Sequence, residues 1–210
     1  MLVNLLRYKI TGEGLKSYTF QKLLEASYSG AEEVEGFTMD KTISSKTSKV
    51  YVHPSGQVVV AHQGTTTASD WGNNAVYASL GDMGYKLTPR YKEALKVQKT
   101  AERKYGAKNV TTIGHSQGGL QAQLVGDKSR EIITLNKATR PQEFLYGSSK
   151  RKNQYDIRAS GDLVSFFRSP FQRKNDQTIN DIGNPLKSHS TDVLGKKKGE
   201  IYGDTKTYVN

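Results

Sequence analysis

A serine stands between paired small residues in Gly114-His115-Ser116-Gln117-Gly118, directly after a β-branched run. A serine hydroxyl of ordinary pKa is a weak nucleophile, so it must be held on a sharp strand-to-helix turn, open to substrate and base. Glycines two positions before and after the serine permit that turn. The N-terminus of the following helix favours negative charge beside Ser116, where an oxyanion would form during acyl transfer. The pattern predicts a nucleophile elbow, although a glycine-rich turn that only packs fits this stretch equally well.

A serine nucleophile needs a base within reach and an acid that orients the base. Three of the four histidines, His53, His62 and His115, precede Ser116. Only His189 follows it, and α/β-hydrolase arrangements place both partners after the serine along the chain. This order favours His189 as the base. His115 lies inside the elbow, and we expect its side chain to point away from the active face.

Asp162 is the favoured acid because it follows a predicted strand and a Ser-Gly turn. A residue at the carboxyl edge of a parallel sheet has this setting. Asp156 falls within the same predicted strand, which disfavours it. Asp176 and Asp181 lie in irregular sequence, and Asp192 is only three residues from His189.

Strands and helices alternate through the centre of the chain, which predicts an α/β fold with a largely parallel sheet. Two β-rich runs around a Pro-Ser-Gly turn form a predicted hairpin, and the second, Val58 to Ala61, is apolar on both faces, as an interior strand would be. The predicted strands are 49–53, 58–63, the run entering the elbow, 131–136 and 154–159. The predicted helices are 16–29, 68–80, 89–105 and 117–127.

The other segments have no assigned helix or strand. A polar covering stretch follows Gly30 as far as Ser48, and the tail from Arg168 onward is polar. Residues 80–89 contain two glycines and a proline without periodicity, which predicts a loop. Such a loop suits a mobile cover, and a plain surface loop explains it equally well.

The chain is basic, with a formal net charge of +11 over 210 residues, and contains no cysteine. A disulfide framework and a thiolate metal site are therefore excluded. The length fits one domain over residues 1–210. The apolar run in residues 1–10 is too short for a signal peptide and no later run reaches membrane-spanning length, so we expect a soluble protein of unassigned compartment.

One stripe of the helix predicted over 89–105 is positively charged. Its members recur at spacings of four, three and four residues: Lys92, Lys96, Lys99 and Arg103. Such spacing puts them on one face. A solvated helix face explains the stripe, and contact with an anionic membrane or, less readily, with nucleic acid is the alternative.

Taken together, the motifs resemble those of the class 3 (fungal-type) lipases. The resemblance spans about residues 20–190 in the family's order. It rests on the following residues: Gly64-Thr65 after an apolar strand, Asp70-Trp71, Asn74, Gly-His-Ser-Gln-Gly-Gly at 114–119, Gly161-Asp162-Leu163-Val164 and His189.

The resemblance implies a compact, single-domain α/β-hydrolase fold with Ser116 as nucleophile, Asp162 as orienting acid and His189 as base. It also implies that the backbone N–H groups of Thr65 and Gln117 are the oxyanion donors, with no cofactor and no metal ion. Two departures are visible. The position before Gly64, commonly arginine in the family, is Gln63, which removes an ion pair behind the oxyanion loop. The segment between Ser116 and His189 is short for the family, so part of the usual acyl-binding wall is expected to be absent.

The sequence therefore predicts a serine carboxylic-ester hydrolase, a lipase or esterase acting on lipid or small acyl esters. Phe166 and Phe167 follow Asp162 and are expected to contact the acyl chain, although ordinary core packing explains them equally well. Two alternatives remain open: an inactive basic adaptor that binds membrane or nucleic acid on the same fold, and an acyl hydrolase for thioesters or amides. The sequence leaves the oligomeric state undetermined.

Overall fold

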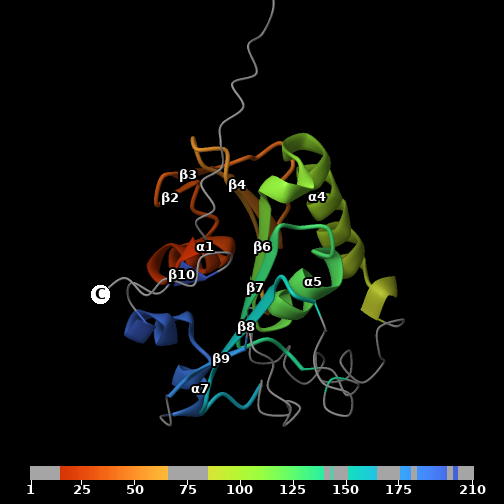
Figure 1. The fold of residues 1–210 in the computed structure, drawn as a ribbon. Coiled ribbons are helices and arrows are strands. Elements are labelled where there is room, and N and C mark those ends of the chain that lie inside the picture. Colours follow the sequence, from red (N-terminus) through yellow and green to blue (C-terminus); the bar gives the residue numbers. More distant parts are fainter. Residues whose placement is uncertain are drawn as a thin grey trace, which may run out of the picture.

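An eight-stranded sheet runs through the centre of the protein (Figure 1). The computed structural model describes residues 15–65, 85–139, 143, 151–164, 176–180, 184–197 and 201–202. The strands in spatial order are β2 (Glu33–Val34), β3 (Phe37–Met39), β4 (Ser48–Val52), β5 (Val58–His62), β6 (Val110–His115), β7 (Glu131–Leu135), β8 (Gln154–Ala159) and β9 (Gln177–Ile179). Pairing is antiparallel from β2 to β5 and parallel from β5 to β9. The predicted mostly parallel α/β sheet is confirmed.

Strand β5 shows why the sheet needs cover on both faces. Every residue of β5 is buried, as predicted for an interior strand. Alternate side chains of a strand point to opposite faces. Val59 and Ala61 accordingly join the core beneath one layer of helix, whereas Val58 and Val60 join the core on the other side. The predicted hairpin of β4 and β5 is also confirmed.

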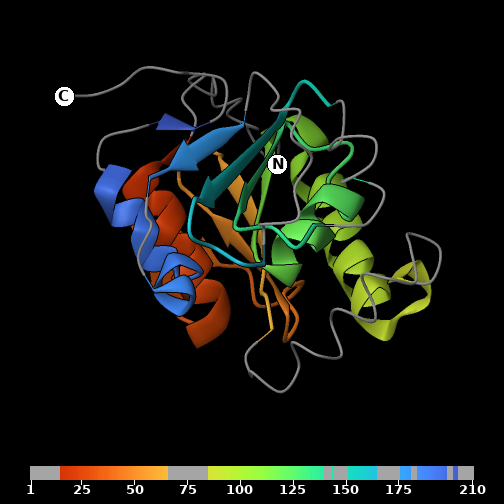
Figure 2. The same ribbon diagram turned by 90° about the horizontal axis from the view of Figure 1, so that it is seen from below.

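Helices form a layer on each face of the sheet, which the view from below shows most clearly (Figure 2). Helix α1 (Ser17–Ser29) covers one face, where it also packs against the 3₁₀ segment η2 (Thr191–Lys197). The other face is covered by α4 (Pro89–Tyr105) and α5 (Gln117–Val125). The smaller elements are η1 (Ala107–Asn109), α7 (Pro185–Ser188) and a separate antiparallel pair, β1 (Leu15–Lys16) with β10 (Ile201–Tyr202).

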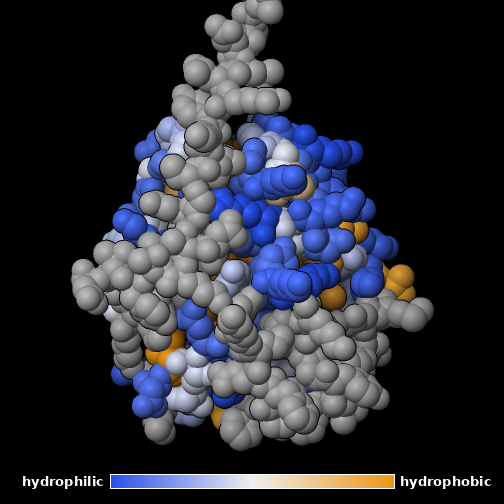
Figure 3. Space-filling view, in the orientation of Figure 1, coloured by the Kyte–Doolittle hydropathy of each residue, from blue (hydrophilic) through white to orange (hydrophobic). Residues whose placement is uncertain are grey.

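Helix α4 has the bounds that the sequence predicted, and it runs antiparallel to β5 and β6. Thr88 caps its first turn by accepting the Tyr91 N–H, and Pro89 stands in the first helical turn. Arg90 contacts the backbone that leaves the carboxyl end of β5, whereas Lys104 at the other end bonds Asp40 at 2.6 Å. All four members of the predicted basic stripe are exposed. The surface over α4 is mostly hydrophilic in the view of Figure 3.

Several segments to which the sequence assigned no helix or strand contain ordered elements. The stretch from 30 to 48 contains β2 and β3, and the tail contributes β9, α7 and η2. Residues 85–87, predicted as loop, are helical, while 80–84 and the predicted helix 68–80 lie outside the described residues. These short elements were missed because tertiary pairing, which lacks a sequence period, forms them. None of the described helices combines the length and apolar composition needed to cross a bilayer.

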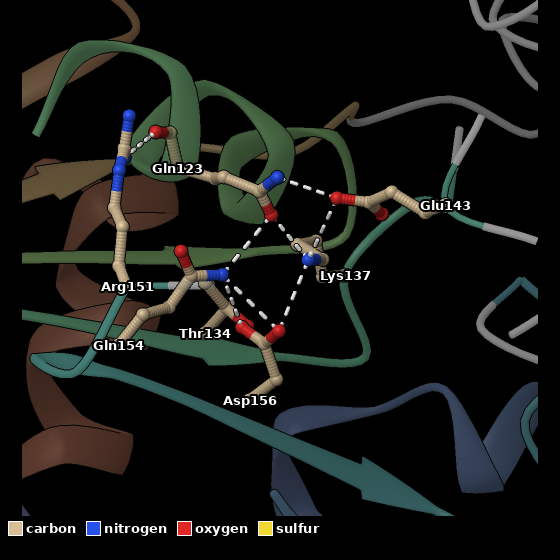
Figure 4. A network of polar contacts seen from close by, with 7 residues as sticks. All are labelled: Gln123, Thr134, Lys137, Glu143, Arg151, Gln154 and Asp156. Atoms are coloured by element: carbon tan, nitrogen blue, oxygen red, sulfur yellow. Dashed lines mark hydrogen bonds and ion pairs between the residues drawn. The ribbon is translucent and has the colours of Figure 1, made fainter. Parts of the chain in front are cut away.

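A buried polar network joins α5 to β7 and β8 (Figure 4). Lys137, which is 7% exposed, donates to Gln123 and lies 3.1 Å from the Asp156 carboxylate and 3.4 Å from that of Glu143. Asp156 also accepts from Thr134 at 2.7 Å. Two carboxylates out of water need a cation among them, because a buried charge without a partner is strongly disfavoured. The network therefore fixes the elbow helix against the sheet.

Removal of the Lys137 charge tests this dependence. Lys137→Met gives an uncharged side chain of nearly the same length and removes a cation that lies between two buried carboxylates, so we expect the free energy of unfolding in urea to fall by about 3–5 kcal/mol. Lys137→Met combined with Asp156→Asn removes one of these carboxylates, and this double variant should lose less stability than the single one. A single variant as stable as the wild type would contradict the assignment.

Candidate active site

Strand β6 turns into helix α5 at Ser116 through a backbone conformation that is rare for a side-chain-bearing residue. Ser116 has φ 57° and ψ −126°. A non-glycine residue held there stores on the order of 1–3 kcal/mol, and such strain clusters at functional sites. Ser116 is half-buried, whereas its neighbours from Gly114 to Gly119 are all buried. The elbow predicted from the sequence is therefore present, and its serine is the residue presented to solvent.

Two glycines allow this turn because backbone occupies the space where their side chains would be. A Cβ built on Gly118 would lie 2.0 Å from the carbonyl oxygen of His62, at the end of β5. A Cβ on Gly114 would lie 2.1 Å from the carbonyl oxygen of Gly118. Both distances are far below van der Waals contact, so only glycine fits at either position. The close approach brings the start of α5 against the carboxyl end of β5.

The predicted acid and base are bonded to each other. His189 Nδ1 lies 2.7 Å from Asp162 Oδ1, and the two residues are 8% and 1% exposed. The same carboxylate oxygen accepts the Val164 N–H at 3.1 Å. A carboxylate accepts hydrogen bonds, so Nδ1 carries the proton of the neutral ring and Nε2 is its unprotonated nitrogen. Asp156, the rejected alternative, lies inside β8 and belongs to the Lys137 network.

The other histidines occupy settings unlike that of a base. His62 is fully buried with Nδ1 2.8 Å from Ser48 Oγ, and burial lowers its pKa to about 4. His53 lies at the β4–β5 turn with Nδ1 2.7 Å from Ser55 Oγ. Of the four histidines, His189 alone is bonded to Asp162, as the order along the chain predicted.

The expectation that His115 points away from the site is wrong. Its ring lies against His189, with centroids 4.7 Å apart, and its Nε2 is 2.6 Å from the carbonyl oxygen of His189. A carbonyl only accepts, so Nε2 carries the proton of a neutral ring, and burial, followed by the nearby His189, lowers the pKa of His115 to about 4. The prediction failed because the side-chain direction at the elbow depends on how the turn sits against α7.

Neutral His115 fixes the direction of a hydrogen-bond chain through Tyr28 of α1. Its Nδ1 is an acceptor, so Tyr28 donates its hydroxyl proton across 2.8 Å. The Tyr28 oxygen in turn accepts the Gly64 N–H at 3.0 Å. Burial raises the pKa of Tyr28 to about 12, which keeps the hydroxyl protonated and able to donate. The chain thus links the segment after β5 to the backbone of His189.

Asn136 holds together the two loops that carry Asp162 and His189. It has φ 46° and is fully buried. Its side chain donates to the Ser188 carbonyl at 2.8 Å and accepts the Ala159 N–H at 2.8 Å. Asparagine tolerates this left-handed conformation better than most residues. The only signal for this residue in the sequence was weak, namely an asparagine at the end of a predicted strand.

The segment after β5 lies directly against the elbow. A Cβ on Gly64 would fall 3.1 Å from the Ser116 Cβ, and the Thr65 hydroxyl donates to the Gln117 side chain at 3.1 Å. The structure therefore brings together Thr65 and Gln117, the residues predicted to supply the oxyanion donors. Their N–H groups belong to a tight loop and to a helix N-terminus, where backbone donors lack intrahelical partners.

Some predicted residues fall outside the described part of the chain: Phe166, Phe167, Asp70, Trp71 and Asn74. Beside Gln63, the position where arginine is common in the family, Arg90 of α4 donates to the carbonyls of Gln63 and Gly64. Among the described residues, no group of three or more histidine or acidic side chains is arranged to hold a metal ion.

The parallel sheet with helices on both faces, and the elbow after a central strand, define an α/β-hydrolase fold. Solved structures with this arrangement include a triacylglycerol lipase from Penicillium expansum, with 18% sequence identity and a TM-score of 0.50 over 76% of each chain. The Lip2 lipase of Yarrowia lipolytica matches with 15% identity and a TM-score of 0.50 over 79% of this chain and 78% of its own. The protein therefore has the fold of these fungal lipases.

Comparison with protein-family models finds no match, and no curated protein sequence matches significantly. The similarity to these lipases is therefore one of fold. The sequence identity is too low for the substrate of those proteins to be assigned to this one. The resemblance predicted from the motifs is confirmed at the level of the fold.

Substitution of the buried elbow glycine tests the close approach. In Gly118→Ala the new methyl group meets the His62 backbone, so α5 must move from β5, and we expect a loss of about 3 kcal/mol or more in unfolding free energy. The control is Gly195→Ala in η2, where nothing lies within 4 Å of the added Cβ. That variant should change stability by less than about 1 kcal/mol. Equal losses of unfolding free energy in both variants would show that the close approach of α5 to β5 does not require glycine at position 118.

Proposed function

We propose that the protein is a serine ester hydrolase that acts on lipid or small acyl esters through an acyl-enzyme on Ser116. The observation that carries the proposal is the 2.7 Å contact between His189 Nδ1 and Asp162 Oδ1, in a chain that also holds Ser116 in a strained conformation at the turn from β6 to α5. A buried carboxylate that orients one ring nitrogen of a histidine, beside a serine on an elbow, is the arrangement that nucleophilic catalysis by serine needs.

In the proposed reaction, the Ser116 oxygen attacks the ester carbonyl carbon while His189 Nε2 takes the hydroxyl proton. The tetrahedral intermediate collapses, the ester C–O bond breaks, and the leaving alcohol receives that proton from His189. Water then repeats the sequence on the acyl-enzyme, with His189 again as base, and releases the acid. Asp162 stabilises the imidazolium formed in each half and keeps Nε2 aimed at the serine.

The negative charge of the tetrahedral intermediate would lie between the N–H groups of Thr65 and Gln117. This role is supported by the contact between their side chains and by the packing of Gly64 against Ser116. Donors fixed before the reaction stabilise the transition state without reorganisation.

An apolar substrate is supported by the side chains next to the acid and the base. Leu163 follows Asp162 and is 59% exposed, and Leu186, three residues before His189, is 73% exposed. Since Asp162 and His189 touch, we propose that these leucines flank one rim of the site. Phe166 and Phe167 are proposed to extend this apolar rim, and residues 80–89 to cover it.

The first test of the proposal is loss of esterase activity. Ser116→Ala and His189→Ala should each lower kcat for a short chromogenic ester by about 10³-fold or more, because triad members act as a unit, whereas Asp162→Asn should leave a trace. A phosphonate inhibitor should label Ser116, as read by mass spectrometry. His53→Gln, at the β4–β5 turn, is the matched control and should retain activity. Labelling of another residue, or full activity in His189→Ala, would refute the assignment.

Peripheral contact with an anionic membrane is a finer part of the proposal, and the direction of α4 limits it. The active site lies at the carboxyl ends of the parallel strands, where α4 begins. Lys92 is therefore near the site edge, and Arg103, eleven residues later, is about 16 Å farther along the helix. Electrostatic attraction decays over a Debye length of about 8 Å at physiological salt. A bilayer at the site edge would attract Lys92 far more than Arg103.

Charge reversal at the two ends of the stripe distinguishes a bilayer bound at the site edge from nonspecific attraction between the basic protein and anionic lipid. Lys92→Glu should weaken cosedimentation with anionic vesicles more than Arg103→Glu, since each basic residue near the surface contributes about 1 kcal/mol. Binding should fall with added salt and with neutral lipid, while both variants keep hydrolysing a short soluble ester. Equal effects of the two reversals would indicate that the site edge does not face the bilayer.

A further inference from the structure

Arg90, in the first turn of α4, directs its charge at backbone rather than at an acid. Its Nη2 donates to the carbonyl oxygens of Gln63 and Gly64, the latter at 3.0 Å. The side chain is half-buried, and no carboxylate of the described residues forms an ion pair with it. A cation partly withdrawn from water is unfavourable unless its donors are well used. Its bonds to two consecutive carbonyls indicate that Arg90 orders the loop that follows β5.

The planarity of the peptide unit links the Gly64 carbonyl to the Thr65 N–H. A trans peptide unit is planar, so its C=O and N–H groups point in opposite directions. The described residues contain no cis peptide bond. When Arg90 holds the Gly64 carbonyl, it therefore also fixes the direction of the Thr65 N–H, on the opposite side of the same plane. This N–H is the one assigned above to the oxyanion.

The preceding peptide units are held as well. The unit between Gln63 and Gly64 is held at both ends, by Arg90 at its carbonyl and by the Tyr28 hydroxyl, which accepts its N–H at 3.0 Å. One unit earlier, the Gln63 N–H donates to the Thr47 carbonyl at 2.9 Å. Helix α4 supports this contact too, since Glu93 accepts the Thr47 hydroxyl at 3.0 Å. Three consecutive peptide planes thus have side-chain or backbone partners.

We propose that Arg90 and Tyr28 are positioning residues that hold the loop of Gln63, Gly64 and Thr65 ready to receive an oxyanion before substrate binds. This inference rests on the proposed function. Arg90 also draws electron density toward the Gly64 carbonyl oxygen, which makes the N–H of the same peptide a stronger donor. Tyr28 couples this loop to the base, because its hydroxyl donates to His115, which in turn contacts the His189 carbonyl.

The test compares turnover with substrate binding on a short soluble ester. In Arg90→Met the Thr65 N–H is present but its direction is no longer fixed, so kcat should fall by about 10-fold to 100-fold. This loss is at most that expected from removing an oxyanion donor altogether. KM should stay within about threefold of the wild-type value. Affinity for an alkyl boronate, which forms a tetrahedral adduct on serine, should fall by the same factor as kcat/KM. Arg90→Lys, which keeps the charge but not the fork, should give a smaller loss. Lys108→Met, an exposed cation in η1, is the control.

Amide hydrogen exchange measures the order of the same loop independently of enzymatic activity. The Gly64 N–H should exchange at least about tenfold faster in Tyr28→Phe, which lacks its acceptor, and faster in Arg90→Met as well. Wild-type kcat in folded Arg90→Met and Arg90→Lys, or unchanged Gly64 exchange in all variants, would overturn the inference. If the wild-type protein neither hydrolyses esters nor labels at Ser116, the proposed function fails, and the exchange rates alone still decide whether Arg90 and Tyr28 order this loop.

Discussion

The candidate site depends on one close contact between backbones, where Gly118 of α5 passes the carbonyl of His62. This approach allows β6 to reverse into α5 within a few residues and leaves Ser116 in a strained conformation at the apex. It also brings the start of α5 beside the segment that leaves β5. The serine and the two predicted oxyanion donors are therefore positioned by the same packing constraint, which no side chain at position 118 would permit.

Around this contact, buried hydrogen bonds set the geometry of the loops. Asn136 ties the end of β8 to α7, Tyr28 ties the segment after β5 to His115, and Arg90 holds the carbonyls of that segment. A neutral hydrogen bond contributes only about 1 kcal/mol to stability, but a buried group left without its partner is unfavourable by more. These bonds therefore select one arrangement of the loops more than they raise the overall stability.

The protonation of His115 connects this geometry to pH. Neutral His115 accepts from Tyr28 and donates to His189, so one ring serves both loops. Burial lowers its pKa to about 4, below its ordinary value. Folded-state stability from keeping the ring neutral is fully present above the ordinary pKa and is lost as pH falls toward 4, because the unfolded chain binds the proton more readily. The link between the loops is thus intact at neutral pH.

The sequence by itself determined the features that depend on short-range chemistry. The elbow at Ser116, the β4–β5 hairpin and the bounds of α4 follow from glycine spacing, turn residues and helix caps, all within a few positions of one another. His189 was predicted from its order along the chain, and Asp162 from its place after a strand and a Ser-Gly turn. The contacts of Asn136, Tyr28 and Arg90 were decided only by the tertiary structure, and so was the direction of the His115 ring. Tyr28 meets His115 across 87 positions and Arg90 meets Gly64 across 26. No periodic pattern marks such partners, because packing of α1 and α4 on opposite faces of the sheet brings them to one loop.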